Sequence, residues 1–298
     1  MNVLRTTDSR FENLEGYPFA PHYIHTHDGI RMHYIDEGDK KAPAVLMLHG
    51  EPSWSYLYRK MIAPVVRAGF RTVVPDLIGF GKSDKPSATE DYSYQKHLDW
   101  VEVIFSDLNL KNATLFVQDW GGLLGLRLLP KYNSIIDNVV AANTFLSTGF
   151  DRPNEAFMAW RKFSQESPKF DIATVIQMAT VTDLSEEILR GYNAPFEQEE
   201  YKAGARIFPS LVPTLKSEEE AQKNAQIWKF LGQYKKPFLT LFSDSDPIMT
   251  GLEKIFQKKI PGAQGQPHEI IRGGGHFLQE DKGEEIAEKL IAFKKAHS

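Results

Sequence analysis

Short apolar runs alternate with longer segments of helical periodicity along most of the chain. An alternation of polar and apolar residues at 31–36 is typical of a half-buried strand. Short, mostly apolar runs predict buried strands at 44–48, 71–74, 114–117, 139–142, 238–242 and 268–271. Apolar residues at helical spacing predict helices at 54–68, 94–108, 122–131, 218–232 and 284–296. This order predicts an α/β fold, in which a mostly parallel sheet carries helices on both faces.

The strand pattern is interrupted between residues 150 and 213, where the chain becomes aromatic, methionine-containing and helical. We expect this segment to be broken by its prolines, Pro153, Pro168, Pro195 and Pro209. A helical block between two strands predicts an inserted cap above the carboxyl ends of the strands, where open α/β sheets bind ligands. The predicted division is a first core part at 1–149, a helical cap at 150–215 and a second core part at 216–298.

Composition narrows the class of protein. The 298 residues are 42% hydrophobic, which is enough for a well-buried core. The net charge of −4 comes from 35 basic and 39 acidic residues that are evenly mixed, so neither nucleic acid nor a membrane is an expected partner. The absence of cysteine excludes cysteine catalysis and disulfides. The chain opens without the apolar stretch of a signal peptide, so we expect a cytoplasmic protein.

The strand predicted at 114–117 runs into a glycine turn and a helix, in the sequence VQDWGG. In the G-x-S-x-G nucleophile elbow, the tip of such a strand-to-helix turn carries the reactive serine. Here the tip residue is Asp119. A carboxylate is already ionised at neutral pH and needs no base to activate it, which favours displacement at a saturated carbon. Val117 stands where the elbow has its first glycine, and this departure bears on the tightness of the turn.

Two later polar segments follow strands in the order nucleophile, acid, base that accompanies this elbow. The segment SDSDP contains Asp244 and Asp246, and a carboxylate there would orient a histidine and stabilise its protonated form. The glycine loop GGGHF carries His276 between the last strand and the last helix. Together with Asp119, these segments predict a catalytic triad at the carboxyl edge of the sheet.

Residues near the nucleophile indicate how charge is stabilised. The segment HGEPSW follows the second predicted strand, and we expect the backbone N–H groups of Glu51 and Trp120 to form the oxyanion hole. Two converging indole N–H groups, which donate and do not accept, would bind a halide ion. Trp120 adjoins the nucleophile, and Trp160 of the cap is the second candidate. Phe157 shares a helix face with Trp160 and is expected to line the pocket.

These segments together resemble the haloalkane dehalogenases, and the resemblance covers essentially the whole chain. HGEPSW and DLIGFGKSDKP are shared with many α/β-hydrolases, whereas QDWGG together with FMAW is much more specific. APF, YKAG, SDSDPI and GGGHFLQE also match the family. The resemblance implies the α/β-hydrolase fold with an eight-stranded sheet. It also implies the subfamily that binds halide between two tryptophans, because the other common arrangement has an asparagine at the position of Glu51.

The resemblance implies a role for each candidate: Asp119 as nucleophile, His276 as base, Asp246 as its acidic partner, and Trp120 and Trp160 as halide donors. The family's acid lies three residues after a small residue that ends the strand, which selects the second aspartate of SDSDP. The implied reaction converts a small halogenated hydrocarbon and water to alcohol, halide and a proton through an alkyl ester. No metal and no cofactor are expected, and a monomer is the expected state.

Alternative functions are compatible with parts of this pattern. An epoxide hydrolase also has an aspartate elbow but uses cap tyrosines as acids, and this cap offers Tyr192 and Tyr201. An ester hydrolase is disfavoured because no serine occupies the elbow, and a luciferase relative would need a much larger pocket. From another class, a hydrophobic-ligand receptor could retain the triad without turnover. Release of halide and acid would indicate a dehalogenase, formation of a diol without halide would indicate an epoxide hydrolase, and no product would indicate a receptor.

Overall fold

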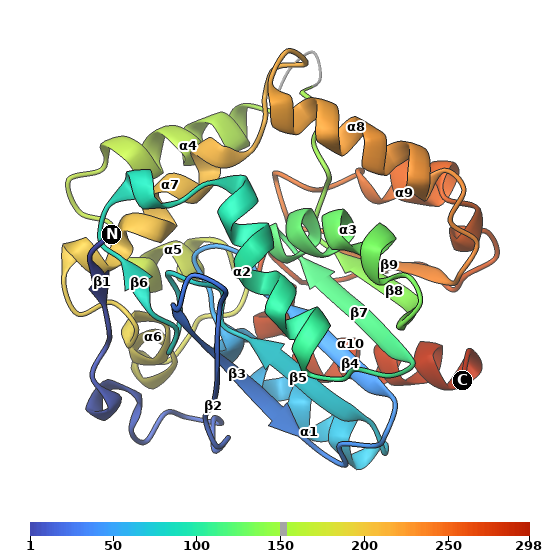
Figure 1. Cartoon of the computed structure of the whole chain (residues 1–298), viewed down its shortest axis with the longest axis horizontal. Helices are drawn as coiled ribbons and strands as arrows, with labels where there is room; N and C mark the ends of the chain where they lie inside the picture. Colours follow the sequence, from blue (N-terminus) through green and yellow to red (C-terminus); the bar gives the residue numbers. More distant parts are fainter. Residues whose placement is uncertain (150–153) are drawn as a thin grey trace.

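A twisted sheet forms the centre of the molecule (Figure 1), and it contains eight strands. The computed structural model describes residues 1–149 and 154–298. The strand order is β10-β9-β8-β7-β4-β5-β3-β2, in which β3 is antiparallel to both neighbours and the other pairs are parallel. The strands are β2 (His22–His25), β3 (Arg31–Glu37), β4 (Ala44–Leu48), β5 (Arg71–Pro75), β7 (Ala113–Gln118), β8 (Ile136–Ala142), β9 (Phe238–Ser243) and β10 (Glu269–Ile271). The predicted mostly parallel sheet is confirmed.

Burial explains which strands the sequence revealed. The central strands β4, β5 and β7 are buried along their whole length, so their sequences are apolar runs without alternation. The edge strand β2 is half-buried and begins and ends with histidine, and it was not predicted. A separate two-stranded pairing joins β1 (Val3–Leu4) to β6 (Lys85–Pro86). It is too short to leave a pattern in the sequence.

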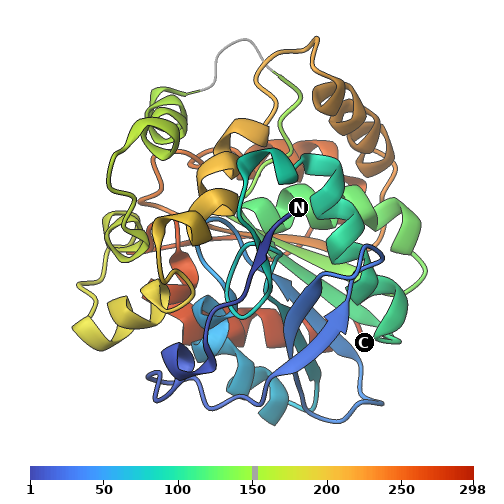
Figure 2. The same ribbon diagram turned by 60° about the vertical axis from the view of Figure 1, so that its left-hand side comes forward.

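Helices cover both faces of the sheet. Figure 2 shows α1 (Arg59–Arg67) and α10 (Leu278–Ala296) together below it, while α2 (Tyr94–Asp107), α3 (Trp120–Tyr132) and α8 (Glu219–Leu231) lie on the opposite side. The helix predicted at 54–68 is a 3₁₀ turn followed by α1, and α10 begins earlier than predicted, with a kink at Lys282. Helix α9 (Glu253–Lys259) was not predicted. Within the described ranges, no helix combines the length and apolar character that a membrane crossing needs.

Among the described residues, four α-helices follow β8 and precede α8: α4 (Glu155–Glu166), α5 (Ile172–Met178), α6 (Glu186–Asn193) and α7 (Ala203–Leu211). We call residues 154–213 the insert. It lies beyond the end of the sheet toward which the arrow of β7 points (Figure 1). Pro168 and Pro195 follow the ends of α4 and α6, but the predicted break at Pro209 is wrong, because this proline lies in the last turn of α7. The predicted cap start at residue 150 and the break at Pro153 fall outside the described residues.

Buried polar contacts attach the insert to the core. The hydroxyl of Tyr192 in α6 donates to Glu280 in α10 at 2.5 Å. Both oxygens of Glu280 also accept from the guanidinium of Arg59, at 2.6 and 2.7 Å. The indole of Trp54 donates to the carbonyl of Gly191 at 3.1 Å. These contacts hold α6 against the loop that follows β4, which is one wall of the site.

Candidate active site

Asp119 lies between the end of β7 and the start of α3, with φ 49° and ψ −125°. A non-glycine residue in this region is strained, as expected for a nucleophile elbow. Hydrogen bonds hold the strained backbone in place: the hydroxyl of Thr144 donates to the carbonyl of Asp119 at 2.7 Å, and the N–H of Asp119 donates to the carbonyl of Asn143 at 3.1 Å. The carboxylate is therefore fixed at the carboxyl edge of the sheet.

Close packing around the elbow requires glycines. A Cβ on Gly50 would lie 2.2 Å from Oδ1 of Asp119, and one on Gly121 would lie 2.1 Å from the carbonyl oxygen of Leu48. The departure at Val117 is accommodated from the helix side. A Cβ on Gly125 would lie 2.8 Å from a methyl carbon of Val117, so the absence of a side chain at Gly125 makes room for the valine. The turn thus forms without the first glycine of the usual motif.

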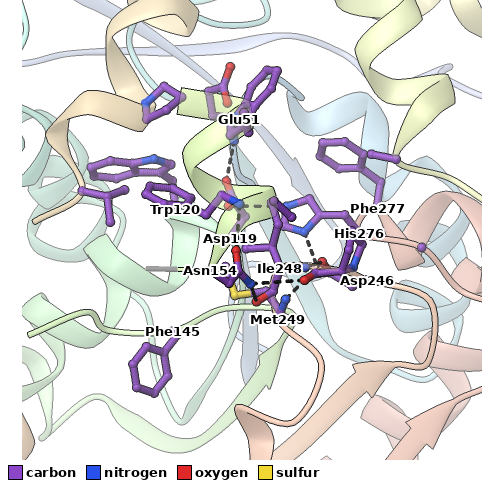
Figure 3. Close-up of a pocket in the computed structure, with 18 of the residues that line it drawn as sticks. Glu51, Asp119, Trp120, Phe145, Asn154, Asp246, Ile248, Met249, His276 and Phe277 are labelled. Atoms are coloured by element: carbon purple, nitrogen blue, oxygen red, sulfur yellow. Dashed lines mark hydrogen bonds and ion pairs between the residues drawn. The ribbon is translucent and has the colours of Figure 1, made fainter. Parts of the chain in front are cut away.

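The structure brings the three predicted triad residues together, as the dashed lines of Figure 3 show. Nδ1 of His276 lies 2.7 Å from Oδ2 of Asp246, and Nε2 of His276 lies 3.4 Å from Oδ2 of Asp119. The carboxylate of Asp244 is exposed and accepts the N–H of Gly273 at 2.9 Å. Of the two aspartates after β9, Asp246 is therefore the one that lies against the histidine.

Burial and charge set the protonation of the pair. Burial lowers the pKa of His276, but the charge of Asp246 and the hydrogen bonds with Asp119 and Asp246 outweigh it and raise that pKa to about 10. Burial raises the pKa of Asp246. The charge of His276 and the hydrogen bonds to this carboxylate together lower this pKa by a larger amount, so the net pKa of Asp246 is below its usual range. The N–H groups of Ile248 and Met249 also donate to Oδ1 of Asp246, at 2.8 and 3.1 Å. The two carboxylates therefore favour the protonated form of His276 in the free enzyme.

One of the two expected oxyanion donors contacts the nucleophile. The backbone N–H of Glu51 donates to Oδ1 of Asp119 at 2.8 Å. Among the described residues, the backbone N–H of Trp120 makes no such bond in this structure. Oδ1 of Asp119 is thus held by an amide while Oδ2 faces His276.

A cavity of about 900 Å³ joins the triad to the insert, and its lining is mostly apolar. Asp119, Trp120, Phe157, Trp160 and His276 all line it. The indole of Trp120 packs edge-on against the ring of Phe208, with centroids 4.4 Å apart. The indole of Trp160 packs against the rings of Phe163 and Phe170, with centroids 6.0 and 5.8 Å away, and these two rings also contact each other. Both tryptophans, Trp120 of α3 in the core and Trp160 of α4 in the insert, are therefore positioned by neighbouring aromatic rings.

Three polar residues that position the site were missed by the sequence analysis. Gln118 donates from Nε2 to the carbonyl of His276 at 3.1 Å, and Asn143 donates to the carbonyl of Gly275 at 2.9 Å. Asn154 caps α4 and donates to the carbonyl of Ile248 at 2.9 Å. Gln118 and Asn143 stand at the carboxyl ends of neighbouring strands, which is the signal that could have found them.

Across residues 1–149 and 154–298, no group of three or more histidine, aspartate or glutamate side chains is arranged to hold a metal ion.

Comparisons with known proteins agree with this geometry. A family model described as the alpha/beta hydrolase fold matches residues 43–283. A haloalkane dehalogenase of Psychrobacter cryohalolentis is 50% identical over 98% of this chain and 98% of its own. Another, from Mycolicibacterium paratuberculosis, is 49% identical over 99% of each. The tetrameric structure of haloalkane dehalogenase DpaA from Paraglaciecola agarilytica matches with TM-score 0.89 and 32% identity over 97% of both chains. This chain belongs to the haloalkane dehalogenases, within the α/β-hydrolase fold.

Proposed function

We propose that this protein hydrolyses haloalkanes to alcohol, halide and a proton through an alkyl ester on Asp119. The observation that carries the proposal is an aspartate at the tip of the elbow, beside a histidine–aspartate pair, in a mostly apolar cavity. The apolar lining suits a neutral hydrocarbon substrate. The family relationship supports the same reaction.

In the first step, Oδ2 of Asp119 attacks the carbon that carries the halogen. This oxygen is the one available, because Oδ1 accepts the N–H of Glu51. The new C–O bond forms as the carbon–halogen bond breaks, and the bonding electrons leave with the halide. The indole N–H groups of Trp120 and Trp160 donate hydrogen bonds to the departing charge. Both side chains line the cavity with Asp119, which supports the subfamily with two halide-binding tryptophans.

In the second step, neutral His276 removes a proton from water, and the water oxygen attacks Cγ of Asp119. Oδ1 becomes the oxyanion, and the amide of Glu51 is already 2.8 Å from it. When the intermediate collapses, the protonated His276 returns its proton to the leaving alkoxide, and the new carboxyl group ionises, which restores the Asp119 carboxylate and releases one proton. Esterification removes the charge of Asp119, which is one of the causes that raise the pKa of His276. The alkylated enzyme therefore releases the histidine proton more readily than the free enzyme, and the base is formed when it is needed.

The position of the two cap tyrosines supports dehalogenation over epoxide opening. An epoxide hydrolase needs an acidic hydroxyl in the pocket to protonate the ring oxygen. The hydroxyl of Tyr192 is buried and donates to Glu280 at 2.5 Å. Neither Tyr192 nor Tyr201 is among the described residues that line the cavity.

We further propose that the insert acts as a cap that closes the cavity, since Phe157, Trp160 and Val175 line it from α4 and α5. A cytoplasmic monomer stays a prediction, and one structural relative is tetrameric. Light scattering coupled to size-exclusion chromatography would measure the state of this chain.

The function is tested by incubating the protein with 1-bromobutane, 1,2-dibromoethane or styrene oxide and following acid, bromide and diol. We expect bromide and acid in equal amounts from the bromides. The Asp119→Ala variant should release none, and the His276→Phe variant should release one bromide per protein while gaining the mass of one alkyl group. Diol from styrene oxide without bromide release would favour an epoxide hydrolase, and no product from any compound would favour a receptor.

A further inference from the structure

The side chain of Glu51 is an unusual part of the cavity wall. Its backbone N–H serves the oxyanion hole, but its carboxyl has no part in the reaction described above. Glu51 is only 4% exposed, lines the cavity, and has an Oε1 atom that is buried without a hydrogen-bond partner among the described residues. Buried polar atoms are paired in the great majority of cases, so an unpaired one in a cavity points to a ligand.

The surroundings of the Glu51 carboxyl favour its neutral form. Burial is the main cause that raises the pKa of Glu51 well above its usual range, and the negative charge of Asp119 raises it further. The charge of His276 and the indole of Trp160, which faces the carboxyl from the insert, act in the opposite direction and are weaker. A neutral carboxylic acid has one O–H donor and no net charge. Like the two indole N–H groups, a neutral carboxylic acid can therefore donate a hydrogen bond to an anion without carrying a charge.

We propose that the carboxyl of Glu51 is a third group of the halide site: protonated, it donates a hydrogen bond to the halide, and ionised, it repels the halide. This inference rests on the proposed dehalogenation. Its location follows from the cavity, because the backbone N–H of Glu51 holds Asp119 and the cavity that Glu51 lines is also lined by Trp120 and Trp160. The halide leaves from the carbon that Asp119 attacks, so it departs into the region that these residues border.

The reaction itself keeps Glu51 protonated. In the first step, the negative charge moves from Asp119 to the halide, so an anion remains beside the carboxyl throughout. A hydrogen bond from an acid to an anion is stronger than one between neutral groups. The O–H of Glu51 would thus add to the indole donors when charge develops on the leaving group, without adding a charge of its own.

The test is the pH dependence of bromide binding, measured by quenching of tryptophan fluorescence at constant ionic strength. For the wild type, the dissociation constant should rise through the titration of Glu51 and be about 100-fold larger two pH units above its midpoint. His276, backed by Asp246, also titrates at alkaline pH and weakens anion binding in every variant. The comparison with Glu51→Gln, which cannot ionise and keeps an N–H donor, isolates the contribution of Glu51.

Glu253 supplies a matched control. It is a glutamate in α9 that is 5% exposed and also has a buried oxygen without a partner, but it does not line the cavity. We expect the Glu253→Gln variant to follow the wild-type pH dependence and the Glu51→Gln variant to show only the part caused by His276. Equal pH dependence in all three proteins would overturn the inference.

A second measurement does not depend on the folding of a variant. The infrared spectrum of the wild-type protein should contain the carbonyl band of a protonated carboxylic acid at neutral pH, and bromide should shift that band. No shift on adding bromide would overturn the inference. The proposed function is judged separately, because bromide release from 1-bromobutane by the wild type would stand whatever the carboxyl of Glu51 does.

Discussion

Replacement of Asp246 by asparagine tests how the triad divides its work between the two steps. The pKa of His276 is raised from 6.5 to about 10. Since one pKa unit corresponds to about 1.4 kcal/mol, its carboxylate partners stabilise the imidazolium by a net of roughly 5 kcal/mol. Asp246 is the larger of these contributors, so its loss removes roughly half or more of this energy. We expect ester hydrolysis to slow by about 10²- to 10⁴-fold, the larger value including loss of the histidine orientation.

Alkylation of Asp119 does not require His276 as a base, so the first step should survive in Asp246→Asn. Rapid-quench measurement of bromide should therefore show a burst of one equivalent, followed by a slow steady state.

In the wild type, turnover should rise with pH through a pKa below about 10, because the ester lacks the charge of Asp119 that raises the free-enzyme value. The contribution of His276 to folding stability changes with pH in the opposite direction and falls as the pH rises. A raised histidine pKa stabilises the fold fully below about 6.5, and this contribution is lost as the pH rises through about 10.

Asp244→Asn is the control for this experiment. Asp244 lies two residues away on the same loop, but its carboxylate is exposed and bonds the N–H of Gly273. It should show neither a burst nor a slower steady state. A burst of equal size in both variants, or a loss of the burst itself in Asp246→Asn, would refute the assigned division of roles.

Other substitutions test the contacts around the site. Tyr192→Phe removes a buried donor to the charged Glu280, and we expect a loss of about 1.5–3 kcal/mol in urea unfolding with bromide release retained. Gly275→Ala places a Cβ 2.4 Å from the carbonyl oxygen of Ala179, so we expect slower ester hydrolysis and a lower melting temperature. Wild-type values of both quantities would contradict the packing argument. Asn154→Ala removes a helix cap and the side-chain bonds to the loop after β9, which should cost about 1 kcal/mol of unfolding free energy, and no change would show that α4 is held by other contacts.

The sequence predicted the parts of the fold in which burial dictates residue type. All seven predicted strands correspond to strands of the sheet, because central strands covered on both faces leave unbroken apolar runs. The edge strand β2 left no such pattern, since its side chains are only half-buried. Helix α9 is short and ends in lysines, so its periodicity covers too few turns to be recognised.

The candidate site was partly predictable for a related reason. Asp119, Asp246 and His276 follow strands at one edge of a parallel sheet, so strand order alone brought them near one another. The residues alone left Asp244 and Asp246 open, because the choice depends on the path of the loop, and only the resemblance to the family selected Asp246, which lies against the histidine. The unpaired oxygen of Glu51 depends on packing between the core and the insert, and no spacing in the sequence indicates it.

The attachment of the insert has a consequence for how substrate range could evolve or be engineered. Asn154 joins the first insert helix to the loop that carries the acid, and Asp281 accepts N–H groups from both Val181 and Gly275, at 3.1 and 2.8 Å, which ties the insert to the histidine loop. The insert, which forms the cavity wall that would contact the hydrocarbon, is thus hydrogen-bonded to the two loops that carry Asp246 and His276. Exchanging the insert for that of a relative would transfer a new specificity without loss of rate only if both of these anchors were carried with it.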